Sequence, residues 1–230
     1  VYTVDMFDGA LKRYSKGSLG CDLWHPLELK GLPDDCRAGI ANNIQSSFKT
    51  LAWPHQHLLA LNPCLGKPSG GIRTICKTAM LYRMAIRGIK GASEWESCFS
   101  QEYDKAKAGS SALRAALERN LRCEIGHWLN KVNGVVFNDF EKFFDSIDIA
   151  QLLTEANAVR FPADLVTLGL QQHLAPRLLQ AEGYTSQPIE ISRGILQGCG
   201  LSVAFTRMLL LRDVHALVST HQDANVSVYV

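Results

Sequence analysis

The sequence predicts an α+β protein, and three kinds of pattern support this prediction. Apolar residues recur at helical spacing in several stretches, for example at Ile40, Ile44 and Phe48. A short apolar run rich in β-branched residues, 135–137, predicts a buried strand. The pair Gly70-Gly71 lies between two apolar arms, which is typical of a β-hairpin.

Several segments have the apolar spacing or the end signals of helices. Pro33-Asp34-Asp35 begins the second of them, and Pro54 ends it. In the fourth, apolar residues recur at every fourth position from Leu113 to Leu129, so we expect this face to lie in the core. The predicted helices cover residues 5–16, 34–53, 80–87, 113–129, 149–159, 163–174 and 201–218.

Strands are expected in two hairpins and in two single segments. The first hairpin covers residues 58–75, and the second covers 177–191 with its turn near Gly183. The single strands are 135–139 in the middle of the chain and 226–230 at its end. At 230 residues the chain could form one large domain or two small ones.

Composition argues against a membrane protein and against a disulfide scaffold. The longest apolar tract, 201–218, is interrupted by Arg207, Arg212 and Asp213, so we expect no transmembrane span. The N-terminus shows no secretory signal. Seven cysteines without a C-x-x-C pair indicate reduced thiols in an intracellular protein, and nucleus and cytoplasm fit equally well.

The formal charge of +2 is distributed unevenly along the chain. Residues 37–90 hold eight basic and no acidic side chains. The remainder has sixteen basic against twenty-two acidic side chains, a net charge of −6. An acid-free basic block beside an acidic remainder is typical of a protein that grips a polyanion on one side, although an ordinary solvated face has the same composition.

Asp139 is the first candidate for a functional residue. It lies where the predicted strand 135–139 meets polar residues, and a carboxylate at the end of a strand is a useful ligand for a divalent cation. Two structural alternatives stay open. Asp139 could end a strand in solvent, and the nearby Asp148 could cap the helix that starts near Ile149.

Two further stretches have chemistry suited to phosphate groups. Lys67 and Arg73 flank the tip of the first hairpin, where two cations could close over a triphosphate or could merely keep a loop soluble. Gly194, Gly198 and Gly200 lie in a loop before a helix. Such a loop can present backbone N–H groups to a phosphate or a base, and it can also serve only to turn the chain.

In this order, the motifs resemble those of reverse transcriptases, especially of non-LTR retroelements and group II introns. Residues 67–75, followed by 81–83, look like the fingers motif of that family. Residues 135–148 look like its first palm motif. Residues 192–202 are similar to its R-G-x-x-Q-G-x-x-L-S loop, and the likeness extends by motif over residues 15–230.

The resemblance implies roles for individual residues. Asp139, with the backbone carbonyl of Phe140, takes the place of a catalytic metal ligand, and Phe144 takes the place of a gate against the ribose 2′-hydroxyl. Cys199-Gly200 departs from the family, which commonly has a small residue and proline there. The other nucleotide-binding residues would be Lys67, Arg73, Gln197 and Gly198, and the basic residues expected to contact nucleic acid are Lys77, Arg83, Arg87, Lys90 and Arg193.

The resemblance also implies a right-hand polymerase, with a helical N-terminal segment at 1–57, fingers at 58–130 and a palm at 131–230 whose antiparallel sheet packs on helices. Its activity would be RNA-directed DNA synthesis, with an RNA template, a DNA primer, a deoxynucleoside triphosphate and two Mg²⁺ ions. No thumb is expected. Tyr229-Val230 matches only the first half of the family's aromatic-x-Asp-Asp motif, so we expect the chain alone to be inactive.

A competing interpretation belongs to a different functional class. The chain could be a non-catalytic nucleic-acid-binding remnant of a decayed retroelement, whose basic block still contacts backbone phosphates. An RNA-templated RNA polymerase is less compatible with the bulky Phe144. An unrelated basic α/β domain would have to carry all three motifs by accident.

Overall fold

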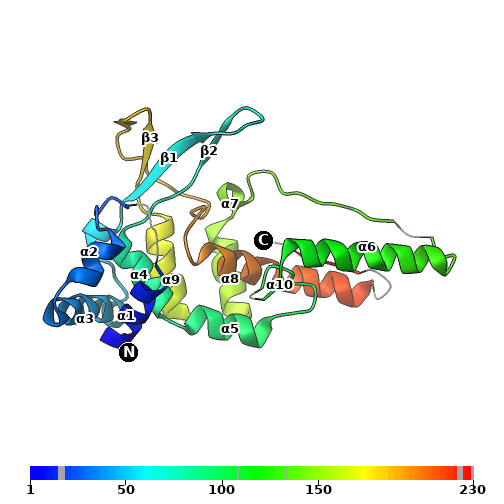
Figure 1. Ribbon diagram of the computed structural model, residues 1–230, viewed down its shortest axis with the longest axis horizontal. Coiled ribbons are helices and arrows are strands. Elements are labelled where there is room, and N and C mark those ends of the chain that lie inside the picture. The colour runs from blue at the N-terminus through cyan, green and yellow to red at the C-terminus, as the bar shows by residue number, and fades with distance from the viewer. Residues whose placement is uncertain (15–18, 108, 133, 222–224, 229–230) are drawn as a thin grey trace.

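The computed structural model describes residues 1–14, 19–107, 109–132, 134–221 and 225–228, and this part of the chain has a mixed α+β fold (Figure 1). Within it, ten α-helices and one 3-10 helix accompany a small four-stranded sheet. The helices are α1 (Val4–Lys12), α2 (Pro26–Gly31), α3 (Asp34–Thr50), η1 (His55–His57), α4 (Met80–Gly88), α5 (Gly91–Phe99), α6 (Ala112–Trp128), α7 (Phe143–Ser146), α8 (Ile149–Ala158), α9 (Ala163–His173) and α10 (Ser202–Thr220). The strands are β1 (Ala60–Gly66), β2 (Ile72–Thr74), β3 (Arg177–Ala181) and β4 (Tyr184–Thr185).

The sheet is built from the two hairpins that the sequence predicts. Its strand order is β2-β1-β3-β4, in which β1 pairs antiparallel with β2 and β3 pairs antiparallel with β4. At the tip of the first hairpin, Gly70 and Gly71 have φ values of +87° and +85°, a conformation that favours glycine. Figure 1 shows the β1–β2 hairpin projecting away from the helices.

The sheet is mixed and not purely antiparallel: β3 and β4, which lie within 131–230, pair antiparallel, but the two central strands, β1 and β3, run parallel. The predicted strand at 135–139 is wrong. These residues form an irregular segment between α6 and α7, with Val136 83% and Phe137 73% exposed. A strand is stabilised by cross-strand neighbours, and no described strand lies beside this segment, so its β propensity has nothing to act on.

The predicted C-terminal strand is reduced to a single bridge in the described residues. Val228 pairs with Asp104, and its backbone exchanges hydrogen bonds with Tyr103 and Lys105. Tyr229 and Val230, which match the start of the aromatic-x-Asp-Asp motif, lie outside the residues that the structure describes.

The start of α4 is completed by a residue far back in the sequence. Ala79 at its N-cap offers no side-chain acceptor, and one carboxylate oxygen of Asp22 accepts from the amides of Met80 (2.6 Å) and Leu81 (3.3 Å) instead. A Cβ at Gly20 would collide with the carbonyl oxygen of Thr78. The close approach of this glycine therefore brings Asp22 to the helix that carries Arg83 and Arg87 of the basic block.

The hydrophobic core is one cluster that runs from the N-terminal helices to α10. Its largest fully buried side chains lie on α1, α2, α4, α8, α9, α10 and the segment just before α10. These elements come from all three of the regions 1–57, 58–130 and 131–230, whose division into fingers and palm stays a prediction. They include Phe7, Leu29, Met80, Tyr82, Met84, Leu152, Leu165, Leu168, Ile195, Leu196, Leu201 and Phe205.

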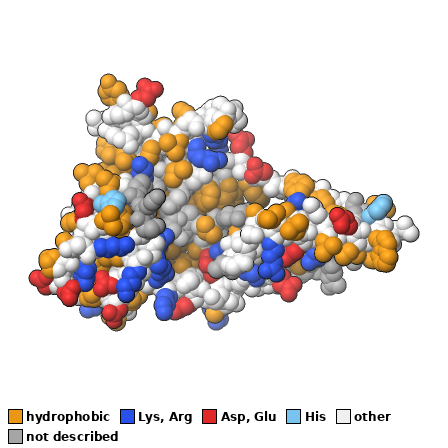
Figure 2. All heavy atoms as spheres, viewed as in Figure 1, with side chains coloured by type: hydrophobic (Ala, Val, Ile, Leu, Met, Phe, Trp, Pro, Cys, Tyr) orange, Lys and Arg blue, Asp and Glu red, His pale blue; other side chains and the backbone are white. Residues whose placement is uncertain are grey.

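The expectation that the apolar face of α6 lies in the core was wrong. Leu113 is 70% exposed and Leu117 is 60% exposed, and Trp128 near the end of the helix is also exposed. Figure 2 shows hydrophobic side chains over the lobe in which α6 lies. Periodicity shows which side chains share a face of a helix, but it does not show whether another element covers that face.

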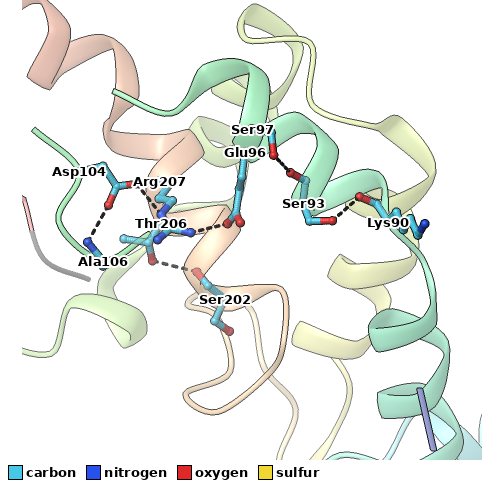
Figure 3. A network of polar contacts seen from close by, with 9 residues as sticks. All are labelled: Lys90, Ser93, Glu96, Ser97, Asp104, Ala106, Ser202, Thr206 and Arg207. Atoms are coloured by element: carbon cyan, nitrogen blue, oxygen red, sulfur yellow. Dashed lines mark hydrogen bonds and ion pairs between the residues drawn. The ribbon is translucent and has the colours of Figure 1, made fainter. Parts of the chain in front are cut away.

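Arg207 ties α10 to α5 and to the loop after α5 (Figure 3). Its guanidinium lies 2.5 Å from a carboxylate oxygen of Glu96 and 2.8 Å from one of Asp104. The side chains of Arg207 and Asp104 are mostly buried, so these ion pairs are shielded from solvent. Helix α10 contains nearly all of the apolar tract 201–218. None of the described helices is long and apolar enough to cross a membrane.

Replacing Arg207 with methionine is expected to lower the free energy of unfolding by about 2 kcal/mol, because two partly buried carboxylates lose their cation. The measurement is urea denaturation of both proteins. Arg212→Met is the matched control, since Arg212 pairs with Glu155 at 3.2 Å but is 58% exposed. Its loss should cost under about 1 kcal/mol, and equal costs for the two variants would contradict the role given to the Arg207 network.

Candidate active site

The glycine-rich loop, defined as residues 192–201, is hydrogen-bonded to the segment 135–148, which resembles the first palm motif. The amide of Ile195 donates to the carbonyl of Phe144 at 2.8 Å, and the amide of Gly194 donates to the carbonyl of Ile147 at 2.9 Å. The Arg193 guanidinium also reaches the carbonyl of Ser146, at 3.2 Å. The loop therefore runs along the segment that contains α7 and Phe144.

Gly194 permits this approach for two reasons. Its φ is +81°, in the region that side chains other than glycine rarely adopt. A Cβ at this position would also lie 2.9 Å from the backbone oxygen of Asp145 and 3.0 Å from that of Phe144. The glycine is required by the contact between the two motifs as well as by the turn itself.

The same loop is bonded to the fingers motif. The amide of Cys76 donates to the carbonyl of Gln197 at 2.8 Å. The Tyr82 hydroxyl lies 3.3 Å from the Cys199 sulfur, at hydrogen-bond distance. Gly198 has a φ of +102°, and a Cβ there would lie 3.2 Å from the Cys76 carbonyl oxygen.

Cys199, which departs from the family pattern, is a structural thiol in this fold. It is buried, and burial raises the pKa of its thiol, so the thiol stays protonated and can take part in a neutral hydrogen bond with Tyr82. Burial also raises the pKa of Tyr82 well above its usual value. Cys199 therefore serves to attach the loop to α4.

A third contact of the loop comes from a residue that the sequence gave no reason to select. His173 ends α9, and its Nδ1 accepts from the amide of Leu196 at 2.7 Å. Burial lowers the pKa of His173 to about 3, and the nearby Arg177 cation contributes in the same direction. A single histidine at the end of an apolar helix carries no sequence signal for such a contact.

These bonds determine which part of the loop is available to a ligand. The amides of Gly194, Ile195, Leu196 and Cys199 are all used inside the protein. Gln197 and Gly198 lie between them and are exposed. This turn, Gln197-Gly198, offers a side-chain amide and a glycine backbone next to Cys76, a combination suited to a base or a sugar.

The acidic candidates do not form a metal site in the described residues. Asp139 and Asp145 are exposed, Asp139 in the irregular segment before α7. Asp148 accepts from the amide of Gln151 at 2.9 Å, which confirms the helix-cap alternative. Within the described ranges, no three His, Cys, Asp or Glu side chains are placed to hold a metal ion. The residues present therefore do not by themselves fit a magnesium pair, and the roles of Asp139 and Phe140 stay predictions.

The cationic candidates lie on three elements. Lys67 and Arg73 are exposed on the projecting hairpin, where Arg73 stands opposite Leu65 in the β1–β2 register, and Figure 2 shows Lys and Arg side chains near this hairpin. Arg87 on α4 stacks on the ring of Tyr14 at 4.0 Å. The remaining candidates lie just before α4, on it, just after it, or in the glycine-rich loop: Lys77, Arg83, Lys90 and Arg193.

No family model matches this chain, and no curated protein matches it in sequence. The likeness to reverse transcriptases therefore rests on the three sequence motifs alone.

Proposed function

We propose that the chain is the fingers and palm part of an RNA-directed DNA polymerase. The observation that carries the proposal is that the glycine-rich loop, one of the three motifs, is hydrogen-bonded to segments of the other two, for example through Cys199 and Tyr82, which are 117 positions apart. A polymerase needs cations over the phosphates, a wall beside the sugar and a surface against the base, all around one nucleotide. Contacts between the segments that would supply them are what this function requires.

The roles in the proposal follow from the chemistry of the side chains. Lys67 and Arg73 on the projecting hairpin would neutralise the triphosphate of the incoming nucleotide. Phe144 would occupy the volume that a ribose 2′-hydroxyl needs, so that the product is DNA. Gln197 and Gly198 would contact the nucleotide and the template base beside it.

The reaction is attack of a primer 3′-hydroxyl on the α-phosphorus of a deoxynucleoside triphosphate, with pyrophosphate as the leaving group. Catalysis in this class uses two Mg²⁺ ions. Mg²⁺ loses its bound water reluctantly, and the single carboxylate of Asp139 is not enough to hold two such ions. The proposal therefore requires further carboxylates close to Asp139 before chemistry can occur.

The test is primer extension on an RNA template by a polypeptide that continues this chain with an aromatic-x-Asp-Asp segment. Asp139→Ala is expected to reduce extension to background. Asp145→Asn is the matched control and should leave measurable activity, because Asp145 has no ligand role in the proposal. Equal losses in the two variants would refute the assignment of Asp139.

The same experiment distinguishes the competing function. A polypeptide that binds an RNA–DNA duplex but never extends the primer, even with the added carboxylates, would be a nucleic-acid-binding remnant. Binding would then fall as salt rises, because the exposed Lys and Arg side chains displace counterions from the phosphates.

A further inference from the structure

His173 is buried directly against the glycine-rich loop. Its side chain is fully buried, its ring centroid lies 5.2 Å from that of Phe205 on α10, and its Nδ1 accepts from the amide of Leu196 at 2.7 Å. Leu196 is the residue immediately before the exposed turn Gln197-Gly198. The imidazole therefore contacts the last buried amide before the part of the loop that a ligand could reach.

The hydrogen bond defines the protonation state of the ring. Nδ1 can accept only if it carries no proton, so the single proton of the neutral imidazole is on Nε2. Nε2 is buried and has no hydrogen-bond partner among the residues that the structure describes. An unsatisfied buried N–H is unfavourable, so a hydrocarbon side chain of similar size would fill this space better. The advantage of the imidazole over a hydrocarbon side chain is the hydrogen bond that it accepts from the Leu196 amide.

Buried polar atoms hold the turn from both sides. Before the turn, Leu196 is held by His173 through its amide and by the Ser202 hydroxyl, which donates to its carbonyl. After the turn, the Cys199 sulfur lies 3.3 Å from the Tyr82 hydroxyl. The exposed pair between these anchors has little freedom to move, because the Gln197 carbonyl also accepts from the Cys76 amide.

We propose that His173 is a positioning residue, which holds the backbone at Leu196 so that Gln197 and Gly198 present a pre-formed surface to the incoming nucleotide. This inference rests on the proposed function for its ligand, but not for its mechanical part. A ligand surface that is ordered in advance does not lose conformational freedom on binding, so its affinity is higher.

The experiment compares His173→Phe with His173→Asn in the 230-residue chain. Phenylalanine keeps the ring volume and removes the acceptor, whereas asparagine places its side-chain oxygen close to the position of Nδ1. The readout is hydrogen exchange of the Leu196 amide, with the most protected amides of α8 as a monitor of global unfolding. We expect exchange at Leu196 to become about tenfold faster in His173→Phe and to stay within about threefold in His173→Asn. Unchanged exchange in His173→Phe would overturn the inference.

A nitrogen NMR spectrum of the unsubstituted chain provides a second check. The Nδ1 resonance of His173 should have the shift of an unprotonated acceptor, and the Nε2 resonance that of a protonated nitrogen. The reverse assignment would also overturn the inference, because a protonated Nδ1 cannot accept from Leu196.

A nucleotide measurement separates this inference from the proposed function. In the polypeptide that continues the chain with an aromatic-x-Asp-Asp segment, His173→Phe should raise the KM for the deoxynucleoside triphosphate several-fold, with a smaller change in kcat. The KM of His173→Asn should be close to that of the unsubstituted polypeptide. Faster exchange at Leu196 with an unchanged KM would overturn the link to the nucleotide. Faster exchange in a polypeptide that never extends primers would overturn the proposed function and leave His173 as the support of the loop.

Discussion

Replacing Gly194 with alanine is expected to lower the free energy of unfolding by about 4 kcal/mol. The alanine would have to hold a φ of +81°, and its methyl group would lie 2.9 Å from the backbone oxygen of Asp145. Backbone atoms cannot swing aside as the end of a long side chain can, so the loop must move away from the palm motif. That movement breaks the hydrogen bond from the Ile195 amide to the Phe144 carbonyl. Urea denaturation measures the loss of stability.

Gly183 provides the matched control for this substitution. It has a similar φ of +84°, at the turn between β3 and β4, but a Cβ there would have no heavy atom within 4 Å. Gly183→Ala should therefore cost only the backbone strain, about 1 kcal/mol. If both variants lose the same stability, the clash with Asp145 does not exist and the loop does not approach α7 as described.

The second large effect is expected in acid. The pKa of His173 is lowered from 6.5 to about 3 in the folded chain, first by burial and then by Arg177. Below pH 6.5 the unfolded chain binds a proton at this residue and the folded chain does not, so stability falls as the pH falls. The slope approaches about 1.4 kcal/mol per pH unit and continues until the pH nears the folded value. Between pH 6.5 and pH 4.5 the loss should be about 2 kcal/mol, with more below.

The measurement is the free energy of unfolding across this range for the unsubstituted chain and for His173→Phe, in which this titration is absent. His57 is shifted in the same direction, mainly by burial, and is present in both proteins, so its effect cancels in the difference. The stability of the unsubstituted chain relative to that of His173→Phe should fall as the pH falls. A difference that stays constant with pH would mean that the imidazole is accessible to solvent.

Local patterns in the sequence predicted much of the fold. Pro33-Asp34-Asp35 and the residues after it gave the helix now seen as α3, and the Gly70-Gly71 pair gave the β1–β2 hairpin. These elements depend on neighbours within a few positions, which a sequence pattern can record. The run 135–139 has equally good strand propensity but pairs with no strand among the described residues, and the apolar face of α6 is largely exposed. Both errors concern what lies across space from a segment.

The candidate site divides in the same way. The three motifs could be located from residue types and spacing, and the glycines of the loop could be identified as turn residues. That Gly194 touches α7, and that Cys199 meets Tyr82, depends on contacts between distant segments. His173 could not be identified from the sequence, because its role depends on its burial against the Leu196 amide and not on a pattern of neighbouring residues.

The order of the loop's partners along the chain has a consequence for synthesis on the ribosome. Cys76, Tyr82, Phe144 and His173 all precede the loop in sequence. Until residues 194–199 have been synthesised, these four residues cannot form their contacts with the loop. Contacts between residues far apart in sequence also form more slowly than helices do. The nascent chain should therefore pass through a long interval with helices formed and its centre open, in which chaperone binding would protect it from aggregation.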